Sequence, residues 1–164
     1  MKIAMIRSTE RFEIEWEDDF EVVALSEDRK TDIAQLYHRT SAPLYGKPDG
    51  GDPDECLRDV DRYLDYHRSN ELYPLFLRGS TLVYCKASGD LIGVCLMAGS
   101  PTEGHVFNLL VDPAFRRRGI ATRMLRHALT VYADTHDKMD LSAEEDGPGR
   151  HLYEKLGFVS IGPA

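Results

Sequence analysis

The sequence predicts a mixed α/β domain built around one sheet. Short segments that alternate apolar and polar residues with the period of a strand are interspersed with segments whose apolar residues recur at helical spacing. The length of 164 residues is typical of one domain rather than two, and no repeat, low-complexity tract or linker divides the chain. We therefore expect residues 1–164 to form a single domain in which helices flank a mixed sheet.

The N-terminal part predicts three strands followed by a helix. Lys2 to Ile6 is a short apolar run, Phe12 to Trp16 alternates apolar and acidic residues, and Phe20 to Leu25 is a third strand-like run. Ser26 is expected to be the N-cap of the helix that follows. The apolar face of that helix consists of Ile33, Leu36 and Tyr37.

The middle of the chain predicts a loop, a second helix and a hairpin. Residues 41–51 are rich in proline and glycine and predict the loop. Asp52 is expected to cap the second helix, because a proline follows it directly and a glutamate stands three positions later. Residues 81–86 and 91–98 flank a short polar turn and predict the hairpin.

The C-terminal part predicts strands that alternate with helices. His105 to Val111 is an apolar strand, and a long helix with one apolar face begins near Gly119. Lys138 to Ala143 predicts a short strand, Pro148 opens a last helix, and Phe158 to Ile161 predicts the final strand.

Composition and charge exclude several classes of protein. The net charge of −8 opposes nonspecific nucleic-acid binding, which requires a basic surface. No apolar run approaches the roughly 20 residues that span a bilayer, and charges interrupt the N-terminus before a signal-peptide core can form. The three cysteines and six histidines show no metal-ligand spacing, so we expect neither a metal site nor a disulfide framework. These features predict a cytoplasmic protein without nucleic-acid or membrane partners.

A strand, an arginine-rich loop and a helix between Phe107 and Thr122 carry the strongest signal for chemistry. Main-chain N–H groups at the start of a helix lack partners, and together with the helix dipole they form a binding site for an anion such as a diphosphate. Gly119 allows the loop to turn, and the small Ala121 allows close approach. The spacing excludes Walker A and Rossmann loops. The alternative is a helix start that carries arginines by chance.

Two motifs resemble signatures of the GNAT (N-acetyltransferase) superfamily. Val111 to Ala121, VDPAFRRRGIA, is similar to the family's strand, VDP, aromatic and Arg/Gln-x-x-Gly-x-Gly/Ala pattern, and Leu152 to Phe158, LYEKLGF, is similar to its second signature. The resemblance covers the C-terminal third of the chain. It implies a mostly antiparallel sheet that is splayed at an acetyl-CoA site, and N-acetyltransferase activity with acetyl-CoA as acyl donor.

The resemblance also implies which residues bind the cofactor. Main-chain groups of Leu109, Leu110 and Val111 would pair with the pantetheine arm, and Arg116 would brace the loop or meet a phosphate. The pyrophosphate would be held by the backbone amides of Arg117, Arg118, Gly119, Ile120, Ala121 and Thr122. The family often has an asparagine before the last helix, where this chain has Asp146, which can accept a hydrogen bond but cannot donate an amide N–H.

Two side chains are candidates for catalysis. Tyr153 matches the family position whose phenol protonates the departing thiolate, and the alternative is an aromatic residue packed on a helix face. His105 stands on the strand before the phosphate loop, where relatives often place a general base, and a neutral imidazole can accept a proton. Glu103 is the second candidate for the base, and the alternative for His105 is a solvent-facing side chain.

The resemblance predicts transfer of an acetyl group to a primary amine of a small molecule or peptide. The rival interpretation is a GNAT-fold sensor that binds acyl-CoA without turnover. Seven acids between Asp49 and Asp65 border the expected acceptor cleft and predict a cationic acceptor, unless they form only a solvated helix face. The seven are Asp49, Asp52, Asp54, Glu55, Asp59, Asp61 and Asp65.

The N-terminal segment of residues 1–19 precedes the family's usual first strand. Family members usually continue into a further strand after the second signature, whereas this chain ends at Ala164. An open sheet edge promotes aggregation. We therefore expect the N-terminal residues to add strand pairing, either in that vacant place or across the interface of a homodimer.

Overall fold

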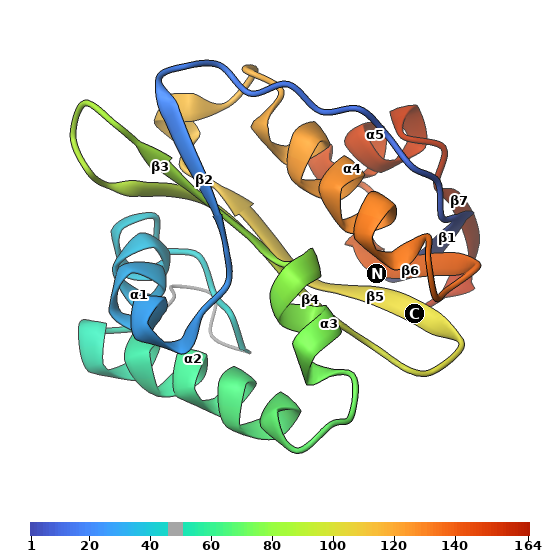
Figure 1. The fold of residues 1–164 in the computed structure, drawn as a ribbon, viewed down its shortest axis with the longest axis horizontal. Coiled ribbons are helices and arrows are strands. Elements are labelled where there is room, and N and C mark those ends of the chain that lie inside the picture. Colours follow the sequence, from blue (N-terminus) through green and yellow to red (C-terminus); the bar gives the residue numbers. More distant parts are fainter. Residues whose placement is uncertain (46–50) are drawn as a thin grey trace.

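The computed structural model describes residues 1–45 and 51–164, and these residues form a seven-stranded sheet with helices on both faces (Figure 1). The strand order is β2-β3-β4-β5-β6-β1-β7. The strands are β1 (Lys2–Ser8), β2 (Phe20–Ala24), β3 (Thr81–Cys85), β4 (Leu91–Gly99), β5 (Glu103–Val111), β6 (Lys138–Glu144) and β7 (Val159–Pro163). All neighbouring strands are antiparallel except β5 and β6. The predicted mixed, mostly antiparallel sheet is confirmed.

Five α-helices of the described residues cover the sheet. α1 (Lys30–Arg39) and α2 (Pro53–Arg68) pack on one face, and α4 (Ile120–Tyr132) packs on the other with α3 (Tyr73–Gly79) and α5 (Pro148–Lys155) beside it (Figure 1). Each face has its own apolar core, because the side chains of β4 alternate between the two. No helix in the described part of the chain combines the length and hydropathy needed to cross a bilayer.

Strands β5 and β6 diverge soon after they begin. Their parallel pairing extends only from Glu103 opposite Lys138 to His105 opposite Asp140, whereas β5 stays paired with β4 as far as Val111. The register between β4 and β5 also shifts beside Phe107, since Leu96 lies opposite Asn108 and Met97 opposite Val106. The sheet is therefore open along the second half of β5, with His105 at the apex.

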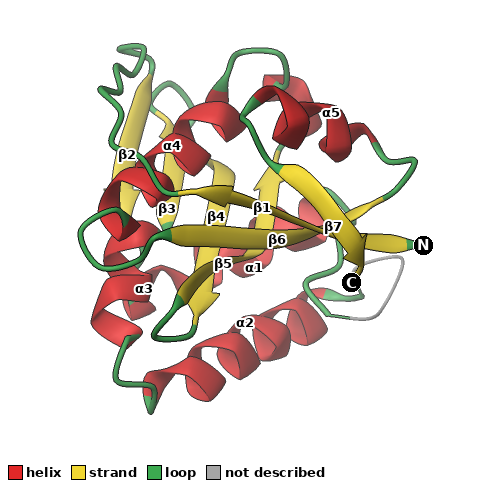
Figure 2. Ribbon diagram, turned by 90° about the vertical axis from the view of Figure 1, so that its right-hand side faces the viewer, coloured by secondary structure: helices red, strands yellow, loops and turns green. Residues whose placement is uncertain are grey.

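The strand predicted at Lys2 to Ile6 is confirmed, and it lies inside the sheet. As β1 it pairs with β6 along its whole length and with β7 on its other side (Figure 2). Ile3 and Met5 are buried in the core shared with α4. β7 pairs with no other described strand, so the N-terminal segment connects β7 to the rest of the sheet.

The prediction of a strand at Phe12 to Trp16 is wrong. Residues 9–19 instead run across α4 from β1 to β2 without joining the sheet (Figure 1). Phe12 and Trp16 still bury part of their rings against the core, which explains the alternating pattern. Helix side chains satisfy the main chain here: the Phe12 N–H donates to Thr130 Oγ1 at 3.0 Å, and Arg123 Nε donates to the Glu15 carbonyl at 2.7 Å.

Of the local predictions, the cap of α2 is confirmed and two others differ from the structure. Asp52 caps α2 as expected, since the Glu55 N–H donates to its Oδ1 at 2.8 Å. Ser26, however, caps no helix, because its hydroxyl donates to the Asp28 carboxylate and a 3-10 turn precedes α1. The short helix α3 was not predicted, although Asn70 accepts a hydrogen bond from the Leu72 N–H just before it. Within the predicted loop, residues 46–50 lie outside the described part of the chain.

Deletion of residues 1–16 is expected to destabilise or aggregate the protein. Without β1, β7 loses its ladder partner, β6 keeps only its short pairing with β5, and Ile3 and Met5 leave the core. Thermal unfolding and size-exclusion chromatography of the truncated chain measure this effect. A soluble truncation that melts at the same temperature, with an unchanged oligomeric state, would show that β1 is dispensable.

Candidate functional site

A cavity of about 560 Å³ lies where β5 parts from β6 and meets the start of α4. It brings together every candidate cofactor-binding residue except Arg118 and Asp146. Its lining includes Leu109, Leu110, Val111, Arg116, Arg117, Gly119, Ile120, Ala121, Thr122 and Tyr153. Residues from three separate elements therefore meet at one surface, although they are up to 44 positions apart in the sequence (153 − 109 = 44).

The start of α4 has the backbone conformation of an anion site. Gly119 is the residue before the helix and adopts φ +74°, and Arg117 adopts φ +65°, which is uncommon for a residue with a side chain. No side chain caps α4, so the N–H groups of residues 120–122 have no hydrogen-bond partner among the described residues. Free amides, the helix dipole and the guanidinium groups of Arg116 and Arg117 all favour a bound anion. The cavity therefore fits a diphosphate.

Arg118 has a different role from its two neighbours. Its Nη2 donates to Glu17 Oε2 at 2.6 Å and to Asp19 Oδ2 at 2.7 Å, and its guanidinium lies 4.7 Å from the Phe20 ring centre. The side chain therefore points away from the cavity, and only its main chain remains available to a phosphate. The Arg118 guanidinium also lowers the pKa of Asp19 by hydrogen bonding.

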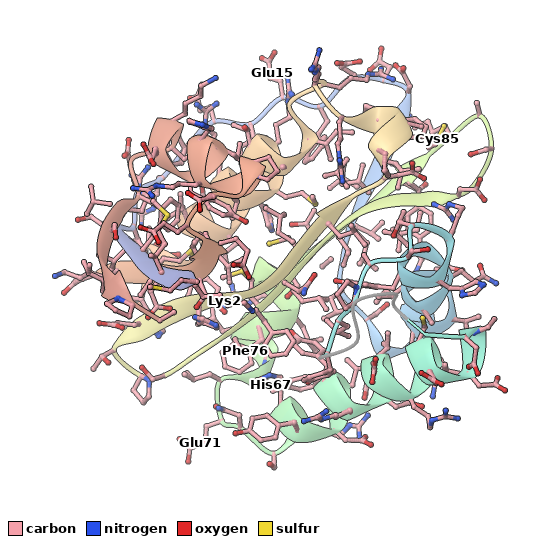
Figure 3. The ribbon with its side chains drawn as sticks, turned by 180° about the vertical axis from the view of Figure 1, so that it is seen from behind. Lys2, Glu15, His67, Glu71, Phe76 and Cys85 are labelled. Atoms are coloured by element: carbon pink, nitrogen blue, oxygen red, sulfur yellow. The ribbon has the colours of Figure 1, made fainter. Side chains whose placement is uncertain are left out.

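Residues 9–19 brace the loop of residues 116–119 through two arginines, Arg118 and Arg123. Arg123 donates from Nη1 to the Arg118 carbonyl at 3.0 Å and from Nε to the carbonyl of Glu15, which is labelled in Figure 3. Together with the Arg118 ion pairs, these bonds connect the loop to the segment that precedes β2. The N-terminal segment thus stabilises the loop conformation as well as the sheet.

Tyr153 lies on α5 and lines the cavity. Its ring packs edge-on against Phe158, with 6.1 Å between the ring centres. A Cβ at position 149 would lie 3.2 Å from the Tyr153 ring, and Gly149 avoids this close contact. Burial raises the pKa of the Tyr153 phenol to about 12, with a smaller contribution from Cys95. The phenol therefore stays protonated at neutral pH and can donate to a developing negative charge.

A second cavity, of about 670 Å³, lies on the α1–α2 side of the opening. Leu109 and Tyr153 line both cavities, so the two meet at the edge of β5. The second cavity is lined by Lys2, Pro43, Leu44, Tyr45, His105, Val106, Phe107, Asn108, Leu109, Leu141, Ser142 and Tyr153. A ligand in the first cavity can therefore reach a ligand in the second at Tyr153.

Asp140, which no sequence motif indicated, holds His105 in place. The His105 Nδ1 lies 2.5 Å from Asp140 Oδ1, across the last register pair of β5 and β6. A carboxylate at Nδ1 fixes the tautomer that carries its proton there and leaves Nε2 as an acceptor. His105 lines the second cavity, whereas the alternative base, Glu103, lines neither cavity. This geometry suits a general base.

The remaining predicted site residues lie outside both cavities. Asp146 is in the exposed turn before α5 and lines neither. Of the acidic stretch, Asp49 lies outside the described residues, Asp61 pairs with Lys30, and Asp65 pairs with Arg68. None of its described acids lines the second cavity. Steering of a cationic acceptor by these acids from a distance stays a prediction. In the described ranges, no group of three or more His, Cys, Asp or Glu side chains could hold a metal ion.

His67, a buried histidine next to the second cavity, is expected to make the stability of the fold depend on pH. His67 of α2 is 7% exposed (Figure 3). The centre of its ring lies 5.7 Å from the ring centre of Phe107 and 5.6 Å from that of Phe76. Its Nε2 has no hydrogen-bond partner among the described residues. Burial lowers the pKa of His67, and His105 acts in the same direction. The unfolded chain therefore binds the proton more readily. Hence the stability that neutral His67 contributes is present above a pH of about 6.5 and falls as the pH drops below it.

His67→Phe is expected to reduce this acid sensitivity, since phenylalanine fills a similar volume and does not titrate. Between pH 8 and pH 5.5, the melting temperature should fall less for the variant than for the wild type. The measurement is a pair of thermal melts at each pH. Equal falls for both proteins would show that His67 does not contribute.

Comparison with known proteins identifies relatives of the chain. A protein-family model described as an acetyltransferase (GNAT) domain matches residues 78–160. GCN5-related N-acetyltransferase 6, chloroplastic, from Arabidopsis thaliana is 32% identical over 95 residues, which cover 52% of this chain and 31% of that protein. The match thus spans less than a third of the plant relative.

Solved structures share the fold at low sequence identity. A GCN5-related N-acetyltransferase from Sphaerobacter thermophilus has a TM-score of 0.68 and 20% identity, and the match covers 98% of this chain but 48% of that chain. Ard1 from Thermoplasma volcanium has a TM-score of 0.62 and 20% identity over 86% of this chain and 83% of that chain. The chain therefore spans about half the length of the first of these structures.

Proposed function

Since the chain belongs to the GNAT acetyltransferase family, we propose that it transfers the acetyl group of acetyl-CoA to a primary amine. The observation that carries this proposal is the meeting of two cavities at Leu109 and Tyr153, at the point where β5 and β6 diverge. One cavity has the amides and arginines for a diphosphate. The other contains a histidine whose orientation a carboxylate fixes.

Acetyl-CoA fits the first cavity because residues there suit its pyrophosphate, its pantetheine arm and its thioester. The pyrophosphate meets the amides of residues 117–122, and the free edge of β5 at Leu109 to Val111 offers main-chain groups to the pantetheine arm. The bound cofactor supplies an acetyl group activated as a thioester. Tyr153 lines both cavities, and the thioester would be placed where they meet.

Each catalytic residue has one proton to move. His105 Nε2 accepts the proton of the attacking ammonium or amine, and Asp140 stabilises the resulting imidazolium. The amine nitrogen forms a bond to the acetyl carbon while the bond from that carbon to sulfur breaks. Tyr153 donates its proton to the departing sulfur, so that coenzyme A leaves as a thiol and the product is an acetamide.

An acyl-CoA sensor without turnover is the second candidate function. It would need the diphosphate site but no base in the second cavity, and the His105–Asp140 pair therefore favours an enzyme. The test is release of coenzyme A thiol from acetyl-CoA over a broad panel of amines. We expect release that depends on the amine, and a lower rate with a changed pH dependence in His105→Ala. Stoichiometric binding of acetyl-CoA with no amine-dependent release across the panel would support the sensor.

A further inference from the structure

The polar side chains that line the second cavity include two with N–H donors for a ligand, Lys2 and Asn108. Lys2 enters the lining from β1, which lies beside β6, and Ser142 enters from β6 itself. In the described part of the chain, no acidic side chain forms an ion pair with Lys2. Glu144, its register partner on β6, lies 3.6 Å from the N-terminal ammonium of Met1. The Lys2 ammonium is exposed near the middle of the view in Figure 3.

Asn108 presents a fixed donor to the same cavity. Tyr37 of α1 is 1% exposed, and its hydroxyl donates to Asn108 Oδ1 at 2.6 Å. Because this oxygen already accepts a hydrogen bond from a buried phenol, the amide has its Nδ2 hydrogens left for a ligand. The Asn108 amide and the Lys2 ammonium therefore both favour a negatively charged or strongly accepting group.

The described lining contains no carboxylate to balance these donors. Asp140, which does not line the cavity, is hydrogen bonded to His105. A simple alkylamine would leave Lys2 without a counter-ion and would bring a second ammonium into the cavity. An amine that also bears a carboxylate would pair with Lys2 and still present its nitrogen to His105. The apolar lining of Leu44, Phe107 and Leu141 would contact its side chain.

We propose that the acceptor is a small amino acid-like amine, with a carboxylate that Lys2 and Asn108 bind and an apolar side chain. This inference rests on the proposed acetyl transfer and specifies its acceptor. The carboxylate places the molecule so that its amine faces His105 at the sheet opening. Lys2 is then a specificity-determining residue, supplied by the N-terminal strand.

The test compares amines that differ only in the carboxylate. Leucine, leucinamide and isoamylamine share one apolar side chain, and kcat/KM is measured for each with wild type, Lys2→Met, Lys2→Arg and Lys86→Met. Lys86 is an exposed lysine outside both cavities, so its variant is a matched control for the loss of one charge. We expect wild type and Lys86→Met to prefer leucine roughly tenfold or more over leucinamide, because a charge-assisted hydrogen bond contributes about 1.5–3 kcal/mol.

The same ratio should fall towards one in Lys2→Met, mainly through a higher KM for leucine, and should be largely restored in Lys2→Arg. Acetylation of leucinamide or isoamylamine by the wild type at least as efficiently as leucine would overturn this inference and leave the proposed function standing. So would a leucine preference that persists in Lys2→Met. If no amine of any kind is acetylated although acetyl-CoA binds, the proposed function itself fails.

Discussion

Gly119→Glu is expected to abolish binding of acetyl-CoA. Gly119 stands at the N-terminus of α4, where the free amides of the first turn face the cavity. A carboxylate there repels the pyrophosphate: two unit charges about 4 Å apart near a protein surface interact by about 4 kcal/mol, which corresponds to roughly a thousandfold loss of affinity. Titration calorimetry with acetyl-CoA measures the change.

Gly119→Gln is the matched control for this experiment. It adds a side chain of the same size at φ +74° and brings the same contact with Arg123, without the charge. Both variants carry the cost of a left-handed conformation, so the difference between them isolates the electrostatic effect. Thermal melts establish that each variant is folded. A folded Gly119→Glu protein with wild-type affinity would contradict the assignment of the phosphate site.

Tyr153→Phe is expected to lower kcat roughly 10²–10⁴-fold, the usual contribution of a positioned general acid. The Tyr153 ring supports the cavity through its contact with Phe158, and phenylalanine preserves that contact. Cofactor affinity should therefore change little, because the proposed role of the hydroxyl is to protonate the thiolate that develops during the reaction. Steady-state kinetics and acetyl-CoA titration separate the two effects.

Tyr66→Phe provides the comparison for Tyr153→Phe. Tyr66 is 77% exposed and lines neither cavity, so removal of its hydroxyl should leave kcat at the wild-type value. A Tyr153→Phe enzyme with kcat as high as that of Tyr66→Phe would assign the proton donor to another group or to water.

Features that depend on a few neighbouring residues could be predicted from the sequence. The short apolar run at Lys2 to Ile6 forms a strand, and the glycine after three arginines marks the start of α4. Asp52 with Pro53 predicts the beginning of α2, because capping depends on bonds between residues three positions apart. The cavity at the arginine loop follows from such a local pattern.

Features that depend on tertiary contacts could not be predicted. Phe12 to Trp16 has the alternation of a strand, but α4 supplies the partners for its main chain. The sequence does not show that the side chain of Arg118 behaves differently from those of Arg116 and Arg117. It does so because Glu17 and Asp19, which are distant in the sequence, form ion pairs with it. Asp140 stands 35 residues from His105, and the short parallel register between β5 and β6 brings them together.

Acetyl transfer at the opening between β5 and β6 is tested most directly by a crystal structure of the protein with acetyl-CoA bound. We expect the pyrophosphate on the amides of residues 117–122, the thioester sulfur within hydrogen-bond distance of the Tyr153 hydroxyl, and the acetyl group facing the cavity that contains His105. A complex whose acetyl group lies away from both Tyr153 and His105 would contradict the proposed site of transfer.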